Sequence, residues 1–289
     1  MTIETLTDPE AMRSRSRAAC AQGRRVGFVP TMGFLHDGHA SLMRRARREC
    51  SLSVASIFVN PAQFGPKEDY ARYPRDLRHD MEVLERAEVD VLFSPEASAI
   101  YPGGHEAQRT WVTVEGLSDL LCGASRPGHF RGVTTVVAKL FQIVEPDVAY
   151  FGRKDAQQAL IVRTMARELN MAVTIDVCPT VREDDGLAMS SRNKYLAPAQ
   201  RAAAPALYRA LTAASQAAAS GERSPQSILA RARAVLAAEP LLELEYLELV
   251  GASDLRPIEG PLTGEALLAV AGRIGTTRLI DNVILAVKE

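Results

Sequence analysis

The chain has 289 residues, of which 47% are hydrophobic and 24% charged, proportions that are typical of a globular protein and argue against long disordered segments. Its 34 Lys and Arg residues against 35 Asp and Glu residues give a formal net charge of -1, so no overall basic field exists to recruit nucleic acid or an anionic membrane. This length favours two domains over one.

The N-terminus and the cysteines indicate the cellular compartment. The segment MTIETLTDPEAM has neither the basic start nor the apolar core of a signal peptide, and no apolar run approaches the length of a membrane span. The cysteines lie far apart and do not follow the spacing of a zinc site, so we expect them to be reduced and mostly buried; they are Cys20, Cys50, Cys122 and Cys178. We therefore expect a cytoplasmic protein that binds neither a membrane nor nucleic acid.

The first part of the chain alternates short apolar runs with segments of helical periodicity. The apolar runs predict buried strands at residues 26–29, 52–59, 89–93, 148–151 and 173–177. The segments between them predict helices at residues 38–50, 76–88, 134–144 and 155–170. This alternation predicts an α/β fold with a doubly wound parallel sheet, in which ligands bind at the carboxyl ends of the strands.

One local charge cluster interrupts this pattern. Arginines occupy positions 44, 45, 47 and 48, within a predicted helix whose opposite face carries apolar residues. A solvated helix face explains this pattern better than a nucleic-acid site does.

The composition changes after about residue 182. Residues 182–192 are polar, residues 198–219 predict one long Ala-rich helix, and residues 225–238 predict another helix. Strand-like runs follow at residues 244–250, 266–270 and 279–285. We therefore expect two domains, residues 1–182 and a smaller helix-plus-antiparallel-sheet domain of residues 183–289, joined by a hinge.

The segment VGFVPTMGFLHDGHASL, residues 26–42, is the most informative part of the sequence. It places His36 and His39 where a buried strand feeds the N-terminus of a helix, and this end of a helix offers unpaired N–H groups and a partial positive charge. Gly33 and Gly38 let the backbone approach a phosphate. Since the sequence lacks both GxxxxGK[ST] and GxGxxG, any ATP must be bound by another element, and this corner is the candidate.

Two further loops follow predicted strands. Gln63 is either a solvated loop amide or a group that donates to a carboxylate and accepts from a hydroxyl, which suits a small hydroxy acid. After residue 151, Gly152 permits close approach, Lys154 is a mobile cation suited to phosphate, Asp155 can cap the next helix, and Gln158 lies one turn into it. An exposed Lys154–Asp155 pair of little energetic weight is the competing interpretation.

The polar loop at residues 185–193 carries Ser190, Ser191 and Arg192, which could close over a triphosphate, although a plain hinge would look similar. Between these loops, Arg126 and His129 could face the same cleft. His79 and His105 lie outside any such cluster, and we expect both to be solvated.

Taken together, these segments closely resemble the pantothenate synthetase family. The motifs PTMGFLHDGH, SIFVNPAQF, ARYPRD, SRPGHFRGVTTVVAKLF, FGRKDAQQ and DGLAMSSRN stand in the family's order, and the resemblance extends from the first strand through LIDN near the C-terminus. The His36-to-His39 element resembles the HIGH motif of class I aminoacyl-tRNA synthetases and related nucleotidyltransferases. Met189-Ser190-Ser191-Arg192 stands where those enzymes carry KMSKS.

The resemblance implies a Rossmann-like domain of the HIGH-motif nucleotidyltransferase type and a two-step reaction. ATP and (R)-pantoate give pantoyl adenylate and pyrophosphate with Mg²⁺, and the amine of β-alanine then attacks the acyl carbon to give pantothenate and AMP. It also implies a homodimer. The metal ligands are unknown from the sequence.

The resemblance also assigns roles to residues of this chain. The catalytic set would be His39, His36, Lys154, Ser190, Ser191 and Arg192. The ATP-binding set would be Met32, Gly33, Phe34, Leu35, His36, Asp37, Gly38, His39, Gly152, Arg153, Lys154, Asp155, Val181, Met189, Ser190, Ser191 and Arg192. The pantoate and β-alanine set would be Gln63, Gln158, Met32, Phe64, Arg126 and His129. The chain departs from the family at Arg153, where Glu is usual, and at Ala156, where an aromatic is common.

Two other functions fit parts of the sequence. A related ligase or nucleotidyltransferase could act on another acid, but the near-neutral charge and the short segment after residue 182 argue against a tRNA synthetase. A nucleotide-sensing protein without turnover would have little need for donors aimed at a leaving group.

Overall fold

A computed structural model describes residues 3–66 and 68–287. The chain divides into two compact units. The first comprises Met1–Arg153 and Gln158–Pro179, and the second comprises Lys154–Gln157 and Thr180–Glu289.

The first unit contains a six-stranded parallel sheet, which confirms the predicted Rossmann-like α/β fold. Its strand order is β1-β4-β3-β2-β5-β6, and every described pair is parallel. The strands are β1 (Glu4–Leu6), β2 (Val26–Thr31), β3 (Leu52–Ile57), β4 (Val91–Phe93), β5 (Val148–Gly152) and β6 (Thr174–Cys178). The order reverses between β2 and β5, and in open α/β sheets this reversal marks the usual ligand-binding edge.

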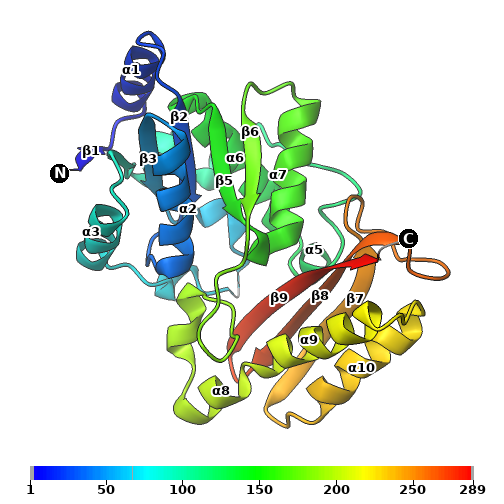
Figure 1. Cartoon of the computed structure of the whole chain (residues 1–289). Coiled ribbons are helices and arrows are strands. Elements are labelled where there is room, and N and C mark those ends of the chain that lie inside the picture. Colours follow the sequence, from blue (N-terminus) through cyan, green and yellow to red (C-terminus); the bar gives the residue numbers. More distant parts are fainter. Residues whose placement is uncertain (1–2, 67, 288–289) are drawn as a thin grey trace. The chain divides into compact units, whose positions relative to one another are not determined.

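Helices cover both faces of this sheet, and Figure 1 shows α2 on the near face with α6 behind. The helices are α1 (Pro9–Cys20), α2 (Asp37–Glu49), α3 (Leu77–Arg86), α4 (Ala97–Ile100), α5 (Cys122–Ser125), α6 (His129–Val144) and α7 (Ala156–Glu168). The last of these begins in the second unit and continues in the first. The elements β1, α1, α4 and α5 were not predicted, and α6 begins five residues earlier than predicted.

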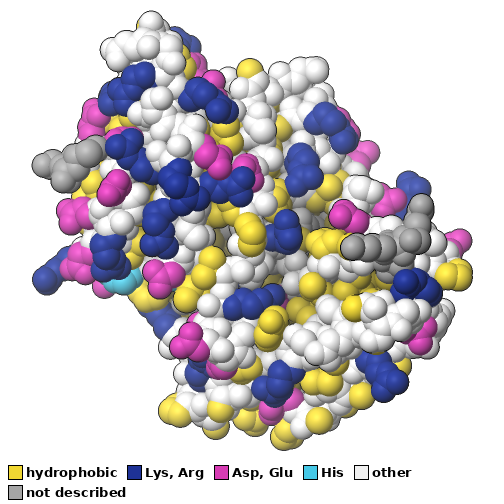
Figure 2. All heavy atoms as spheres, in the orientation of Figure 1, with side chains coloured by type: hydrophobic (Ala, Val, Ile, Leu, Met, Phe, Trp, Pro, Cys, Tyr) yellow, Lys and Arg dark blue, Asp and Glu magenta, His cyan; other side chains and the backbone are white. Residues whose placement is uncertain are grey.

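Helix α2 shows why the sequence folds this way. Its buried side chains, Leu42, Met43 and Ala46 among them, pack on the sheet. The arginines lie on its other side, where Arg45 forms an ion pair with Asp176 at 2.8 Å. Figure 2 shows basic side chains interspersed with acidic ones over the face that carries α2, which confirms a solvated helix face.

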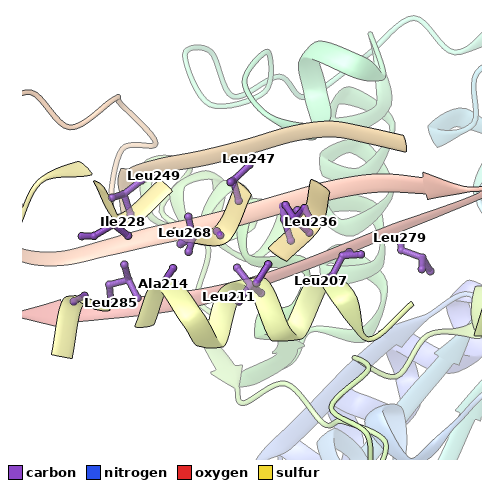
Figure 3. Close-up of a cluster of buried hydrophobic side chains, with 14 of the residues drawn as sticks. Leu207, Leu211, Ala214, Ile228, Leu236, Leu247, Leu249, Leu268, Leu279 and Leu285 are labelled. Atoms are coloured by element: carbon purple, nitrogen blue, oxygen red, sulfur yellow. The ribbon is translucent and has the colours of Figure 1, made fainter. Parts of the chain in front are cut away.

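The second unit contains an antiparallel sheet covered by helices. Its strands are β7 (Leu242–Gly251), β8 (Gly264–Ile274) and β9 (Thr277–Val287), in the order β7-β8-β9. Helices α9 (Ala206–Ala219) and α10 (Pro225–Ala237) pack on one face, and Figure 3 shows Leu207 and Leu211 on α9 turned toward Leu236 and Leu268.

The single long helix predicted for residues 198–219 is wrong. The structure has two helices there, α8 (Pro198–Ala203) and α9, because Pro205 has no backbone N–H to donate and its ring crowds the preceding turn.

Cys50, Cys122 and Cys178 are buried and Cys20 is exposed, which confirms the expectation that the cysteines are mostly buried. Within the described residues, no helix has the length and apolar character that a membrane crossing requires.

Candidate active site

The loop after β2 carries the two histidines, and its first turn depends on a glycine. Thr31 Oγ1 donates to the Ser56 carbonyl at 2.6 Å and accepts from the Gly33 N–H at 3.1 Å. Gly33 has a φ of +81°, and a Cβ there would lie 2.9 Å from both Asp80 Oδ2 and Ile57 Cγ2. Both the backbone conformation and the lack of space therefore require glycine.

Helix α3 holds the next residues of this loop through a buried carboxylate. Asp80 is 2% exposed, and its oxygens accept from the N–H groups of Phe34 at 2.9 Å and Leu35 at 2.6 Å. Its neighbour His79 donates from Nε2 to the Leu35 carbonyl at 2.9 Å. Phe34 has a φ of +50°, an unfavourable conformation for a residue with a side chain, and these hydrogen bonds stabilise it.

Burial raises the pKa of Asp80 above its ordinary value, although the two backbone N–H groups act in the opposite direction. The expectation that His79 is solvated is wrong, because it is half-buried against this loop and its ring lies 5.9 Å from that of Phe34. His105 is also half-buried, with its ring 6.5 Å from that of Tyr101.

The geometry at the start of α2 fixes which nitrogen of each histidine carries a proton. His36 is the N-cap, and its Nδ1 accepts from the Gly38 N–H at 3.2 Å. His39 Nδ1 accepts from the His36 N–H at 3.3 Å. A nitrogen that accepts a hydrogen bond has no proton, so Nε2 is the protonated nitrogen of each neutral ring. The ring centroids are 4.1 Å apart, and the pair therefore offers two neighbouring N–H donors at a helix N-terminus.

The loop after β3 brings Gln63 to the end of β2. Gln63 belongs to the short 3-10 helix η1 (Pro61–Gln63), is 9% exposed, and donates from Nε2 to the sulfur of Met32 at 3.0 Å. The next residue, Phe64, is half-buried and packs on the rings of Tyr70 and Tyr73. Gln63 is therefore a buried amide at the strand edge, which excludes the solvated loop amide.

His129 contacts the Gln63 backbone, and Arg126 contacts both His129 and Glu68. Arg126 donates to both carboxylate oxygens of Glu68, at 2.7 and 2.6 Å, and to His129 Nε2 at 2.9 Å. Because Nε2 accepts, Nδ1 of a neutral His129 carries the proton, and it donates to the Gln63 carbonyl at 2.8 Å. Burial tends to raise the pKa of Glu68, but the bonded Arg126 outweighs it and the pKa lies below its ordinary value.

Two further candidates of the first unit follow β5. Gly152 is the last residue of β5, and Gln158 is half-buried in the first turns of α7. Arg153, where the chain departs from the family, is exposed.

In the second unit, Lys154 is held to the sheet through its backbone. Its carbonyl accepts from Asn282 Nδ2 on β9 at 2.8 Å, and its Nζ lies 3.6 Å from Asp155 Oδ2. The Lys154 side chain is only 19% exposed. The competing interpretation, an exposed pair, therefore describes Asp155, whose side chain is 46% exposed, but not Lys154.

The polar loop of the second unit is a small hairpin. The Met189 N–H donates to the Val181 carbonyl at 3.0 Å, and Arg182 pairs with Ala188 in an antiparallel bridge. Ser190 then caps the short 3-10 helix η5 (Ser191–Tyr195) by accepting from the Arg192 N–H at 3.2 Å. The candidate residues Ser190, Ser191 and Arg192 therefore share one turn.

Ion pairs hold this hairpin. Arg182 contacts both oxygens of Asp281, at 2.6 and 3.0 Å, and its guanidinium lies 4.3 Å from the centre of the Tyr208 ring. Asp281 is 3% exposed. Arg201 pairs with Glu183 and Asp185 at the other side of the hairpin.

Most of the candidate residues thus form three groups, one in the first unit and two in the second. In the first unit, the turn from Met32 to His39 and the segment around Gln63 lie together, with Asp37 exposed at the start of α2. In the second unit, Lys154 and Asp155 form one group. The hairpin, with Val181 and the residues from Met189 to Arg192, forms the other. Sequence reasoning missed the residues that hold these loops in place, which are Asn60, Asp80, Tyr101, Arg182, Arg201 and Asp281.

Known proteins resemble this chain over nearly its whole length. A family model described as Pantoate-beta-alanine ligase matches residues 4–284. The pantothenate synthetase of Moorella thermoacetica is 51% identical over 287 residues, which are 99% of this chain and 100% of that protein.

Solved structures agree with this result. The crystal structure of pantothenate synthetase from Thermus thermophilus has a TM-score of 0.90 and 48% identity, covering 97% of this chain and 99% of the other. The pantoate-beta-alanine ligase of Francisella tularensis, solved in complex with beta-gamma ATP and beta-alanine, has a TM-score of 0.78 and 33% identity, covering 98% of each chain.

Proposed function

The chain belongs to the pantoate–β-alanine ligase family, and we propose that it joins (R)-pantoate to β-alanine through an adenylate that stays on the enzyme without a covalent bond to it. It is a ligase that forms an amide bond and uses ATP to do so. The family matches nearly the full length, which argues against the tRNA synthetase alternative.

In the first step, a carboxylate oxygen of pantoate attacks the α-phosphorus of ATP, and the bond from that phosphorus to the pyrophosphate oxygen breaks. The reaction brings anions together and builds charge on the phosphate oxygens, so positioned donors accelerate it. The observation that carries this proposal is the pair of Nε2–H donors on His36 and His39 at the N-terminus of α2, beside the switch point of the sheet.

In the second step, the amine of β-alanine attacks the acyl carbon, the bond to the AMP oxygen breaks, and a proton leaves the nitrogen. We assign His39 as the group that donates to the phosphate in the first step. Lys154, Ser190, Ser191 and Arg192 would bind the triphosphate and the departing pyrophosphate, because a cation and short hydroxyls suit those oxygens.

Pantoate would be bound by Gln63 and Gln158, with Met32 and Phe64 against its dimethyl end. The position of Gln63 beside Met32 supports this assignment. Arg126 and His129 stay in the acid-binding set, His129 as the residue that holds the Gln63 carbonyl and Arg126 as the partner of His129. The remaining nucleotide contacts would come from residues 33–35, 37, 38, 152, 153, 155, 181 and 189.

Residues 1–182 would form the catalytic domain and residues 183–289 a lid. We further propose a cytoplasmic homodimer that uses Mg²⁺. Among residues 3–66 and 68–287, no three His, Cys, Asp or Glu side chains form a group that could hold a metal. Mg²⁺ that accompanies ATP is held largely by phosphate oxygens and water, so we assign it no residue and no step.

The proposal can be tested by mixing the protein with ATP, Mg²⁺ and pantoate in the absence of β-alanine. We expect about one equivalent of pyrophosphate per active site and an adenylate that stays with the protein on rapid gel filtration. If neither forms, the protein does not catalyse the proposed first step. Offering amino acids instead of pantoate is the control, and an amino acid that releases more pyrophosphate than pantoate would identify a different acid substrate.

A further inference from the structure

A buried polar network behind Gln63 contains groups that the proposed function does not use. Asn60 and Tyr101 are each 1% exposed. The Tyr101 hydroxyl donates to Asn60 Oδ1 at 2.8 Å, and Asn60 Nδ2 donates to Gln63 Oε1 at 3.1 Å. The network therefore runs from a buried phenol to the amide assigned to the acid substrate.

Two backbone groups fix the orientation of the Asn60 amide. Its oxygen accepts from the Ala62 N–H at 3.3 Å, and its nitrogen donates to the Gly132 carbonyl at 3.1 Å. An N–H can only donate and a carbonyl can only accept, so a reversed Asn60 amide would lose both bonds. A Cβ on Gly132 would overlap the Ala62 carbonyl, so glycine at this position allows α6 to approach η1 this closely.

The orientation of Asn60 in turn determines that of Gln63. Since Asn60 presents N–H toward Gln63, the group of Gln63 that faces it must be the oxygen. The NH₂ group of Gln63 then points the other way, toward the sulfur of Met32 at 3.0 Å. Gln63 thus has its acceptor occupied inside the protein and its donor on the side of the β2 loop.

Tyr101 completes this arrangement. Burial raises the pKa of its phenol, which keeps the hydroxyl protonated and able to donate. Without that hydroxyl, the Asn60 oxygen would keep only the longer bond from the Ala62 N–H. The Asn60 amide, and with it the bonded Gln63 amide, would then be held less firmly.

We propose that Tyr101 is a positioning residue for substrate selection: acting through Asn60, it locks the Gln63 amide so that its NH₂ group donates to an oxygen of the hydroxy acid. This rests on the proposed role of Gln63 in acid binding. The site then favours acids that present a hydrogen-bond acceptor at that point, and it discriminates against analogues that present only a donor or a methyl group there.

The test is the change Tyr101→Phe, which removes only the hydroxyl. We expect the KM for pantoate to rise about 3- to 10-fold, the range for one buried hydrogen bond, while kcat and the KM for ATP change less than about twofold. The matched control is Tyr150→Phe, because Tyr150 is also fully buried and donates to a side chain, Glu49, that is outside the candidate site. The control should lose similar stability and leave the KM for pantoate unchanged.

A double-mutant cycle separates positioning from general packing. In a Gln63→Ala background, Tyr101→Phe should have no further effect on the KM for pantoate, because the group through which it acts is gone. An unchanged KM in the single variant, or an equal rise in both backgrounds, would overturn the inference. Failure of the proposed function is a separate result, since the unaltered protein would then release no pyrophosphate with pantoate.

Discussion

The two loops assigned to phosphate are held in place by different kinds of interaction. The histidine loop after β2 is held by backbone N–H groups that donate to the buried Asp80, and by the capping bonds of the imidazoles. The hairpin of the second unit is held by ion pairs, in which Arg182 and Arg201 contact carboxylates.

Because the two loops are held by different interactions, we expect them to respond differently to salt. Hydrogen bonds to a buried carboxylate such as that of Asp80 are screened little by salt. Exposed ion pairs contribute little to stability and weaken as salt rises. We therefore expect the first loop to be insensitive to salt, and the Arg201 ion pairs of the hairpin to weaken as salt rises.

The largest effect should come from the histidine loop itself. The change His39→Ala removes one of the two Nε2–H donors, and we expect kcat to fall about 10²- to 10³-fold, as on removal of one transition-state donor elsewhere. Steady-state kinetics would measure this. The matched control is His105→Ala; because its ring packs on Tyr101, whose expected effect is on the KM for pantoate, the quantity compared is kcat, which should stay unchanged in the control. Full activity of the His39 variant would remove that residue from the mechanism.

The second effect tests the carboxylate that holds this loop. The change Asp80→Asn keeps the shape of the side chain but sets an NH₂ group against one of the two backbone N–H groups. We expect a fall in kcat of about 10-fold or more and a loss of about 1–3 kcal/mol in the free energy of unfolding. Urea unfolding and kinetics on the same preparation would measure both. A destabilised variant with unchanged kcat would show that Asp80 supports the fold and not the histidines.

The third effect compares the buried Arg182–Asp281 ion pair of the hairpin with the more exposed ion pairs of Arg201. The change Arg182→Lys replaces the two-point contact with the buried Asp281 by a single charge, so we expect a loss of about 1–3 kcal/mol in unfolding free energy and a several-fold rise in the KM for ATP. Arg201→Lys, on the more exposed pairs, should cost less than about 1 kcal/mol. Equal losses for the two variants would contradict this distinction.

The smallest effect concerns the ion pair beside Gln63. The folded-state pKa of Glu68 lies below its ordinary value of 4.5, so the pair stabilises the protein fully above pH 4.5. That contribution is lost as the pH falls through the lower folded-state pKa. Urea unfolding between pH 5.5 and about pH 3.5 should therefore show a steeper loss for the unaltered protein than for Glu68→Gln, by less than about 1 kcal/mol. Parallel curves would show that the pair contributes nothing.

Much of this fold follows from local patterns. Apolar runs of strand length identified β2, β3, β4 and β5, because strands buried on both faces are almost continuously hydrophobic. The strand β1 is too short for periodicity to detect. Helix α1 was detectable from its caps, since Asp8 accepts from the Ala11 N–H and Pro9 occupies the first turn.

The residues that hold the site were harder to predict because their partners are distant in sequence. Asp80 contacts residues 45 and 46 positions away. One signal was available: Asp80 stands on the face of α3 that also carries Val83 and Leu84, and an acid on a buried face needs a partner. For Tyr101 and Asn60 the spacing gives no such signal, and only the tertiary structure brings them together.

The most direct measurement follows oxygen atoms through the reaction. Pantoate labelled with ¹⁸O in its carboxylate should give AMP that carries one ¹⁸O atom and pyrophosphate that carries none, because the carboxylate oxygen that attacks the α-phosphorus leaves with AMP. Label in the pyrophosphate, or AMP without label, would contradict attack by the carboxylate on the α-phosphorus and with it the adenylate reaction proposed for this chain.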